Sequence, residues 1–165
     1  MGDIQDGKVT LGGQKKIDKN VEGLPELYLK PGDLLYNRTN SAELVGKTGI
    51  YEGHEDEYTF ASYLIRIRCV DGFVFSRYLN FVMSTPSFRE TQISPHLKQQ
   101  CGQANVNGTI MKSMIVSVPS FAEQHRIVAK VDELMALCDQ LKSRITDASR
   151  LQQKLADVLV EQAVA

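Results

Sequence analysis

The sequence contains no tryptophan, only three cysteines and an aromatic content of 7%. No apolar run approaches the roughly 18 residues that span a bilayer, so no membrane helix is expected. The cysteines, Cys69, Cys101 and Cys138, are far apart and lack metal-ligand spacing, which favours a reducing cytoplasm over a disulfide-bonded secreted fold. The chain does not start with a basic segment followed by an apolar one, so no secretory signal is predicted.

Motifs of common enzymes are also missing. The sequence holds no G-x-x-x-x-G-K-[ST] loop, no G-x-G-x-x-G, no G-x-S-x-G and no H-E-x-x-H. The three histidines have no ligand spacing to one another or to the cysteines, and the acidic run Glu55-Asp56-Glu57 has no nearby basic or nucleophilic partner. We therefore predict no catalytic site, no metal site and no cofactor.

The net charge of −1 argues against binding nucleic acid through bulk charge, but the charges are unevenly distributed. The segment from Phe60 to Lys112 contains six basic residues and only two acidic ones, Asp71 and Glu90. The basic residues are Arg66, Arg68, Arg77, Arg89, Lys98 and Lys112. A local positive face and chance clustering on a solvated surface are both open interpretations.

Short β-type runs separated by turns fill much of the chain before residue 119. Strands are expected at 34–36, 45–51, 60–69 and 113–118, and a polar loop at 102–108. Short helices are expected at 76–84, capped by Ser76, and at 86–93, with Pro86 in the first turn. Because strands and helices do not alternate in regular βαβ order, the predicted class is α+β.

The strongest local pattern begins at Ser120-Phe121-Ala122-Glu123, a capping box. From there to residue 165 the chain has neither glycine nor proline, and apolar residues recur at alternating spacings of four and three. This heptad stripe predicts a long coiled-coil helix at about 120–162. Its members are Ile127, Val131, Leu134, Cys138, Leu141, Ile145, Ala148, Leu155 and Leu159.

The length of the predicted helix indicates the role of its apolar stripe. A helix of about 42 residues is about 63 Å long, whereas a domain of about 120 residues is roughly 35 Å across. The distal apolar residues therefore need another surface, and a helix from a second chain is the simplest one. A hairpin that folds back near Thr146, Asp147 and Ser149, the weakest helix formers of the segment, is the alternative.

Two polar segments carry side chains that suit contacts with DNA. Arginine and lysine pair with guanine, and asparagine and glutamine pair with adenine. The candidates are Arg38, Asn40, Ser41, Lys47, Lys98, Gln99, Gln103, Asn105 and Asn107, together with Arg66 and Arg68 from the basic cluster. The same residue types also populate ordinary turns, so a purely structural role stays open as well.

Several segments resemble the specificity subunit of type I restriction–modification enzymes, in its target recognition domain and the conserved-region helix that follows. The most specific segment, 122–135, resembles the family's helix nearly residue for residue, and the resemblance covers most of the chain. The segments are Leu29-Lys30-Pro31-Gly32-Asp33-Leu34-Leu35, Asn37-Arg38-Thr39-Asn40-Ser41, Glu43-Leu44-Val45-Gly46-Lys47, Asn105-Val106-Asn107-Gly108, Val118-Pro119 and Ala122-Glu123-Gln124-His125-Arg126-Ile127-Val128-Ala129-Lys130-Val131-Asp132-Glu133-Leu134-Met135.

The resemblance implies a non-catalytic, cytoplasmic DNA reader, with a target recognition domain at 1–119 and a conserved-region helix at 120–165. In this family each subunit carries two recognition domains, one for each half of a bipartite target, held apart by two long antiparallel helices. Modification (methyltransferase) subunits carrying S-adenosylmethionine and ATP-driven restriction subunits assemble around it. The expected partners are double-stranded DNA, those subunits and a second copy of this chain paired through the helix.

This sequence departs from the family pattern in two ways. It has one recognition domain and one long helix where the family has two of each. Its first residues also resemble the interior of a recognition domain and not the family's usual opening segment. A half-subunit, a fragment and a truncated product that retains only helix-mediated protein interaction are the open alternatives.

Overall fold

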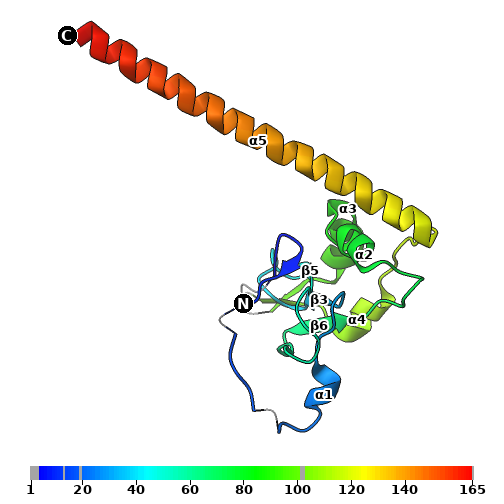
Figure 1. Ribbon diagram of the computed structural model, residues 1–165. Coiled ribbons are helices and arrows are strands. Elements are labelled where there is room, and N and C mark those ends of the chain that lie inside the picture. The colour runs from blue at the N-terminus through cyan, green and yellow to red at the C-terminus, as the bar shows by residue number, and fades with distance from the viewer. Residues whose placement is uncertain (1–3, 13, 19, 101–102, 165) are drawn as a thin grey trace. The chain divides into compact units, whose positions relative to one another are not determined.

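The computed structural model describes all residues except 1–3, 13, 19, 101–102 and 165. The chain forms two compact units, Met1–His125 and Arg126–Ala165. The first unit contains two β-sheets with short helices, and the second is the greater part of one long helix, α5 (Figure 1). The predicted α+β class with a long C-terminal helix is confirmed.

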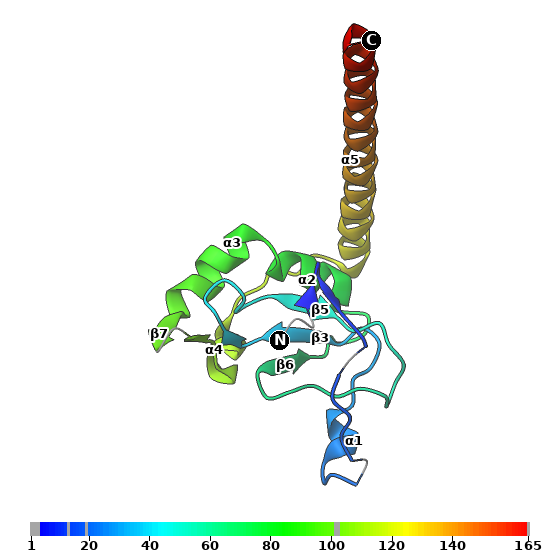
Figure 2. The same ribbon diagram turned by 90° about the vertical axis from the view of Figure 1, so that its left-hand side faces the viewer.

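The larger sheet has the strand order β1-β2-β5-β3-β6. Its strands are β1 (Ile4–Gln5), β2 (Lys8–Val9), β5 (Thr48–Ile50), β3 (Leu34–Asn37) and β6 (Leu64–Ile67). All neighbours pair antiparallel except β2 and β5, which are parallel. Leu35 lies opposite Gly49 of β5 on one side and Arg66 of β6 on the other, so β3 is central. Figure 2 shows these three strands together, with α2 beside β5.

Strand β3 is buried along its whole length because both faces of the sheet carry apolar residues. Tyr36 belongs to one core, with Val45, Met83, Phe88, Ile93, Ala104 and Val106. Leu35, the preceding residue, belongs to a second core on the opposite face, with Leu29, Tyr51 and Leu64. Successive residues of a strand point to opposite faces, so a continuous apolar run supplies both cores.

The helices before the long one are short. They are α1 (Leu24–Leu27), α2 (Ser76–Met83), α3 (Pro86–Phe88) and α4 (Gly108–Ser113), and a π-helical turn (Arg89–Ile93) and a 3₁₀ turn (Ser94–His96) follow α3. The helices expected at 76–84 and 86–93 are therefore present. The prediction that Ser76 caps α2 was wrong. The capping position is Phe75, whose N–H donates to the side chain of Gln124.

The expectation for 102–118 was wrong in two places. Residues Gln103–Asn105 form a strand, β8, and the strand expected at 113–118 is absent from the described residues, where α4 ends at Ser113. Met114 and Val116 still alternate toward the first core, which explains the misleading pattern. Their segment pairs with no strand, and the N–H of Ile115 donates instead to the side chain of Gln92.

Helix α5 runs without a break over Phe121–Val164. It begins as expected, with the N–H of Glu123 donating to Oγ of Ser120 at 3.3 Å. Because the helix continues through residues 146–149, the alternative hairpin is wrong. In the part of the chain that the structure describes, no helix is long and apolar enough to cross a membrane.

An ion pair between the buried Asp33 and the partly exposed Arg68 joins the start of β3 to the end of β6. The Asp33 side chain is 2% exposed and accepts hydrogen bonds from Nε and Nη2 of Arg68, at 2.7 and 2.6 Å, and from the N–H of Lys30 at 2.9 Å. The hydrogen bond to Asp33 raises the pKa of Arg68, so the guanidinium stays charged.

We expect Asp33→Asn to lower the free energy of unfolding by about 2 kcal/mol, because an amide aims a donor at the guanidinium and leaves buried groups unpaired. The partial exposure of Arg68 keeps the loss below that of a fully buried pair. Urea unfolding at fixed protein concentration measures it, with exposed Asp71→Asn as the control. Equal midpoints for the two variants would contradict the assignment.

Candidate nucleic-acid interface

The two polar segments of the sequence, 37–41 and 98–107, meet in a second sheet. This sheet contains β4 (Thr39–Asn40), β8 (Gln103–Asn105) and β7 (Lys98–Gln100), in the antiparallel order β4-β8-β7. Thr39 lies opposite Asn105, and its hydroxyl hydrogen-bonds Oδ1 of Asn105 at 3.1 Å. The small sheet thus collects five candidate residues: Asn40, Lys98, Gln99, Gln103 and Asn105.

For three of these residues, Lys98, Gln99 and Gln103, the structure describes only the backbone pairing. Lys98 lies opposite Asn105, and Gln99 lies opposite Ala104, which in turn faces Asn40 on the other side. The pairing places backbone positions separated by about 60 residues of sequence within one narrow sheet, as an interface built from two loops requires.

Arg38 joins the small sheet to the large one. Its N–H donates to the carbonyl of Tyr63 at 3.0 Å, and its own carbonyl accepts from the N–H of Val106 at 2.9 Å. The side chain is half-buried, and its Nε has no hydrogen-bond partner among the described residues. Arg38 therefore carries a positive charge at the junction where β3 continues into β4.

Lys47 lies at the end of a loop, 41–47, that closes onto β3. The N–H of Asn37 donates to the carbonyl of Lys47 and the N–H of Gly46 donates back to Asn37, both at 2.9 Å. Gly46 has a φ of +91°, and a Cβ there would overlap the side chain of Ile93, so the turn requires glycine. The closed loop leaves Lys47 and Ser41 exposed.

Arg89, which the sequence marked only as one member of the basic cluster, braces this loop from the π-helical turn. Its Nη1 donates to the carbonyl of Val45 at 2.9 Å and its Nη2 donates to the carbonyl of Ala42. Burial raises the pKa of the nearby Tyr36 to about 12, while the charge of Arg89 acts in the opposite direction, so the phenol stays neutral. No local signal could have revealed a contact across more than 40 residues.

Two asparagines among the candidates also have structural partners. Oδ1 of Asn107 accepts from the N–H of Ile110 at 2.9 Å and caps helix α4. Oδ1 of Asn40 accepts from the N–H of Ser41 at 2.8 Å, and the Nδ2 of Asn40 is buried with no partner in the described part of the chain. For Asn107 the structural interpretation suffices, because capping explains the residue type.

Arg66 and Arg68 belong to the larger sheet, and their guanidinium groups have internal partners. Nη1 of Arg66 donates to the carbonyls of Glu26 and Tyr28 at 2.9 and 2.8 Å, and the guanidinium lies 5.5 Å from the centre of the Phe60 ring. Arg68 is paired with Asp33. These contacts hold the α1 segment and β3 to β6, so a DNA contact by either arginine would have to be made in addition to them.

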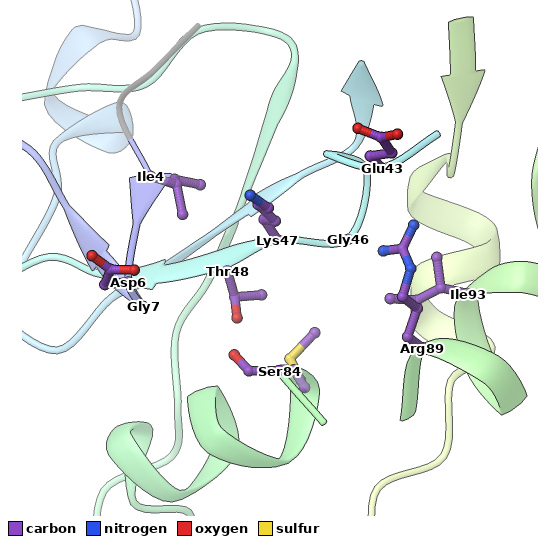
Figure 3. Close-up of a pocket in the computed structure, with 11 residues that line it drawn as sticks. Ile4, Asp6, Gly7, Glu43, Gly46, Lys47, Thr48, Ser84, Arg89 and Ile93 are labelled. Atoms are coloured by element: carbon purple, nitrogen blue, oxygen red, sulfur yellow. The ribbon is translucent and has the colours of Figure 1, made fainter. Parts of the chain in front are cut away.

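A pocket of about 350 Å³ adjoins the Lys47 loop. It lies between the β1–β2 turn, the loop and the end of α2, and Figure 3 shows Thr48 directed toward Ser84. The buried hydroxyl of Thr48 has no hydrogen-bond partner among the described residues. The lining of the pocket combines the positive charges of Lys47 and Arg89 with the negative charges of Asp6 and Glu43. A mixed lining suits water better than an ion of one sign.

Across the described residues, no three histidine, cysteine or acidic side chains are close enough to hold a metal ion. Burial raises the pKa of the Cys69 thiol, and the charges of Asp33 and Asp71 raise it further, so this thiol is protonated and unreactive.

The sequence pattern of the type I restriction modification DNA specificity domain matches residues 5–148. Since that range covers most of the 165 residues, the chain belongs to this family of DNA specificity domains. The resemblance inferred from the sequence motifs is thereby confirmed.

Curated relatives agree with the family assignment. The chain is 27% identical over 149 residues to the specificity subunit of the type I restriction enzyme StySPI from Salmonella potsdam, covering 90% of this chain and 32% of that subunit. It is 29% identical over 147 residues to the EcoKI specificity subunit of Escherichia coli K12, covering 88% of this chain and 31% of that subunit. The chain spans about a third of the length of these relatives.

Replacing Arg89 should loosen the 41–47 loop without unfolding the unit. In Arg89→Met two charge-assisted hydrogen bonds are lost, so we expect local opening to become easier by about 2 kcal/mol. The Gly46 amide should then exchange its hydrogen about 30-fold faster, measured by NMR. Lys112→Met, which removes an exposed positive charge, is the control, and unchanged exchange at Gly46 would show that Arg89 does not brace the loop.

Proposed function

We propose that this chain is the non-catalytic DNA-reading part of a type I restriction–modification complex, acting in the cytoplasm. The observation that carries the proposal is the small sheet, which joins two polar segments far apart in the sequence. Membership in the DNA specificity domain family supports it. Double-stranded DNA is the proposed ligand, and the target recognition domain corresponds to residues 1–119.

Recognition combines two kinds of contact. Lys47 and Arg38 supply positive charge for phosphates, while Asn105 and the glutamines of β7 and β8 supply hydrogen bonds to base edges. Asn40 ranks below them because its Oδ1 accepts from the N–H of Ser41 and its Nδ2 is buried. Since the whole chain has a net charge of −1, we expect modest affinity that falls as salt rises. Arg66 and Arg68 rank below these residues because their guanidinium groups already hold β6 to its neighbours.

The long helix is proposed to pair with the same helix of a second copy and to separate two DNA readers. The residues of the heptad stripe at its far part are exposed, with Leu141 48% and Ile145 69% exposed. A helix of 44 residues is about 66 Å long, and each large apolar side chain left in water forgoes roughly 1.5–3 kcal/mol. Modification and restriction subunits would then assemble around the pair.

A protein that binds partners only through this helix is the rival function, and the same exposed stripe favours it. The two differ in what happens when DNA is added. Sedimentation with and without duplex DNA separates them, because only a DNA reader sediments faster with DNA. Selection from a library of random duplexes, with modification subunits present, tests sequence preference; recovery of no preferred sequence would remove the proposed function.

Lys47→Ala should weaken binding to the selected duplex about three- to tenfold near 0.1 M salt, because one phosphate contact is lost. The slope of log affinity against log salt should become shallower by about one. Fluorescence anisotropy at several salt concentrations measures both. Lys16→Ala removes the same charge from an exposed position outside both the small sheet and the 41–47 loop and should change neither. Equal behaviour of the two variants would clear Lys47 of a DNA contact.

The double variant Leu141→Asp/Ile145→Asp should sediment as a monomer, because two carboxylates cannot be buried in a helix seam without a large desolvation cost. Ser143→Asp is the control, since residue 143 lies between these positions on the opposite side of the heptad and should leave the dimer intact. Analytical ultracentrifugation across a range of concentrations measures the outcome. A dimer that survives the double change would mean that the stripe is not the pairing surface.

A further inference from the structure

Gln124 is a polar residue in the first turn of α5, and its side chain is completely buried. Its Nε2 donates to the carbonyls of Phe73 and Pro119, at 2.9 and 3.0 Å, and its Oε1 accepts from the N–H of Phe75 at 2.8 Å. One amide thus pairs with three backbone groups. These four residues are called the Gln124 latch below.

The latch connects the beginnings of two helices. Phe75 is the capping residue of α2, and Pro119 lies just before α5. A second hydrogen bond joins the same two places, from the hydroxyl of Tyr78 in α2 to the carbonyl of Ser117 at 2.7 Å. All of these residues belong to the Met1–His125 unit, so the ties fix the first turn of α5 within that unit.

Aromatic contacts hold the turn from a further side. The ring of Phe75 stacks on His125 with centroids 4.1 Å apart and planes 19° apart. Phe121 meets His125 edge to face, with centroids 4.7 Å apart. Such ring pairs prefer defined geometries, so they resist rotation of the first turn about the helix axis.

The chemistry of the latch requires both functions of an amide. A glutamate would keep the acceptor for Phe75 but lose both donors, and its carboxylate would face two carbonyl oxygens. An apolar side chain would leave all three backbone groups without this partner. The amide therefore contributes to stability, and because its three hydrogen bonds are directional they also select one orientation of the turn.

A small error in this orientation would be amplified along α5. About 39 helical residues follow His125, which is about 58 Å of helix, so a tilt of about 10° at the base moves the far end by roughly 10 Å. That displacement corresponds to about three base pairs of DNA, at 3.4 Å each. A spacer between two DNA readers therefore needs a rigid base.

We infer that Gln124 is a positioning residue: the Gln124 latch sets the direction in which α5 leaves the domain, and through it the spacing between two DNA half-sites. The spacing part rests on the proposed function, whereas the direction part does not. The residue acts through the helix and does not itself touch DNA.

Distances between two spin labels test the direction without DNA. The labels are attached at Ser62→Cys and Ser143→Cys, both exposed positions, with the three native cysteines replaced by serine and unlabelled protein in excess. With Gln124 present we expect one narrow distance distribution, and in Gln124→Glu one at least twice as wide. Gln140→Glu makes the same chemical change on the exposed part of α5, outside the heptad stripe, and should keep the narrow distribution.

A distribution in Gln124→Glu as narrow as in the Gln140→Glu control would overturn the inference, and so would a broad one in the protein that keeps Gln124. Near-UV circular dichroism verifies folding. If Gln124→Glu does not fold, Tyr78→Phe decides, because it removes only the hydroxyl tie to Ser117 and keeps the ring; it should widen the distribution by a smaller amount, and no widening would overturn the inference.

A second measurement addresses the spacing. Duplexes carry two copies of the selected half-site separated by spacers that differ by one base pair. The protein that keeps Gln124 should prefer its best spacer at least tenfold over one three base pairs longer, and Gln124→Glu should lose most of this preference while its affinity for a single half-site stays within twofold.

A retained spacer preference in Gln124→Glu would overturn the role in spacing, whereas a merely structural residue would lower half-site affinity instead. The two failures are distinguishable. If the protein that keeps Gln124 binds no half-site, the proposed function fails, and the label distances alone then decide whether the latch sets the direction of α5.

Discussion

Backbone pairing along residues 34–40 joins the two sheets of the first unit. Strand β3 pairs with β5 on one side and β6 on the other, and after Arg38 the same chain pairs with β8 of the small sheet. Because β3 is buried on both faces, its alternating side chains also supply both apolar cores. The candidate interface is therefore continuous with a strand that is buried along its whole length.

The segments that carry the polar residues of the candidate interface are held in place by contacts of other residues. Arg89 holds the Lys47 loop through two carbonyls, and the glycine at position 46 lets that loop pack against Ile93. The pair of Asp33 and Arg68 fixes the beginning of β3 to β6. A surface built in this way can vary its exposed side chains without disturbing the contacts that support the fold.

The long helix poses a different physical problem from the sheets. Its first turn is held by a fully paired buried amide, whereas the heptad stripe farther along is exposed. In the functions proposed above, the held first turn orients the helix and the apolar stripe pairs with another helix, so different residues would carry these two properties.

Patterns that depend on near neighbours were sufficient for much of this protein. The heptad spacing from Ile127 to Leu159 and the capping box at Ser120 determined the long helix, since helix periodicity and capping are local. The run Leu34-Leu35-Tyr36 determined a buried strand for the same reason. The family motifs, above all residues 122–135, identified the class of protein.

Contacts between distant segments were decided only by the tertiary structure. The apolar alternation at 113–118 is typical of a strand, but a strand also needs a neighbouring strand to pair with. Here α4 includes Ser113, and the N–H of Ile115 donates to the side chain of Gln92. The meeting of β4 with β8, the brace from Arg89 and the latch at Gln124 each join residues more than 40 positions apart. Residue type alone does not reveal such partners, because arginine, asparagine and glutamine suit a DNA contact and a buried backbone contact equally well.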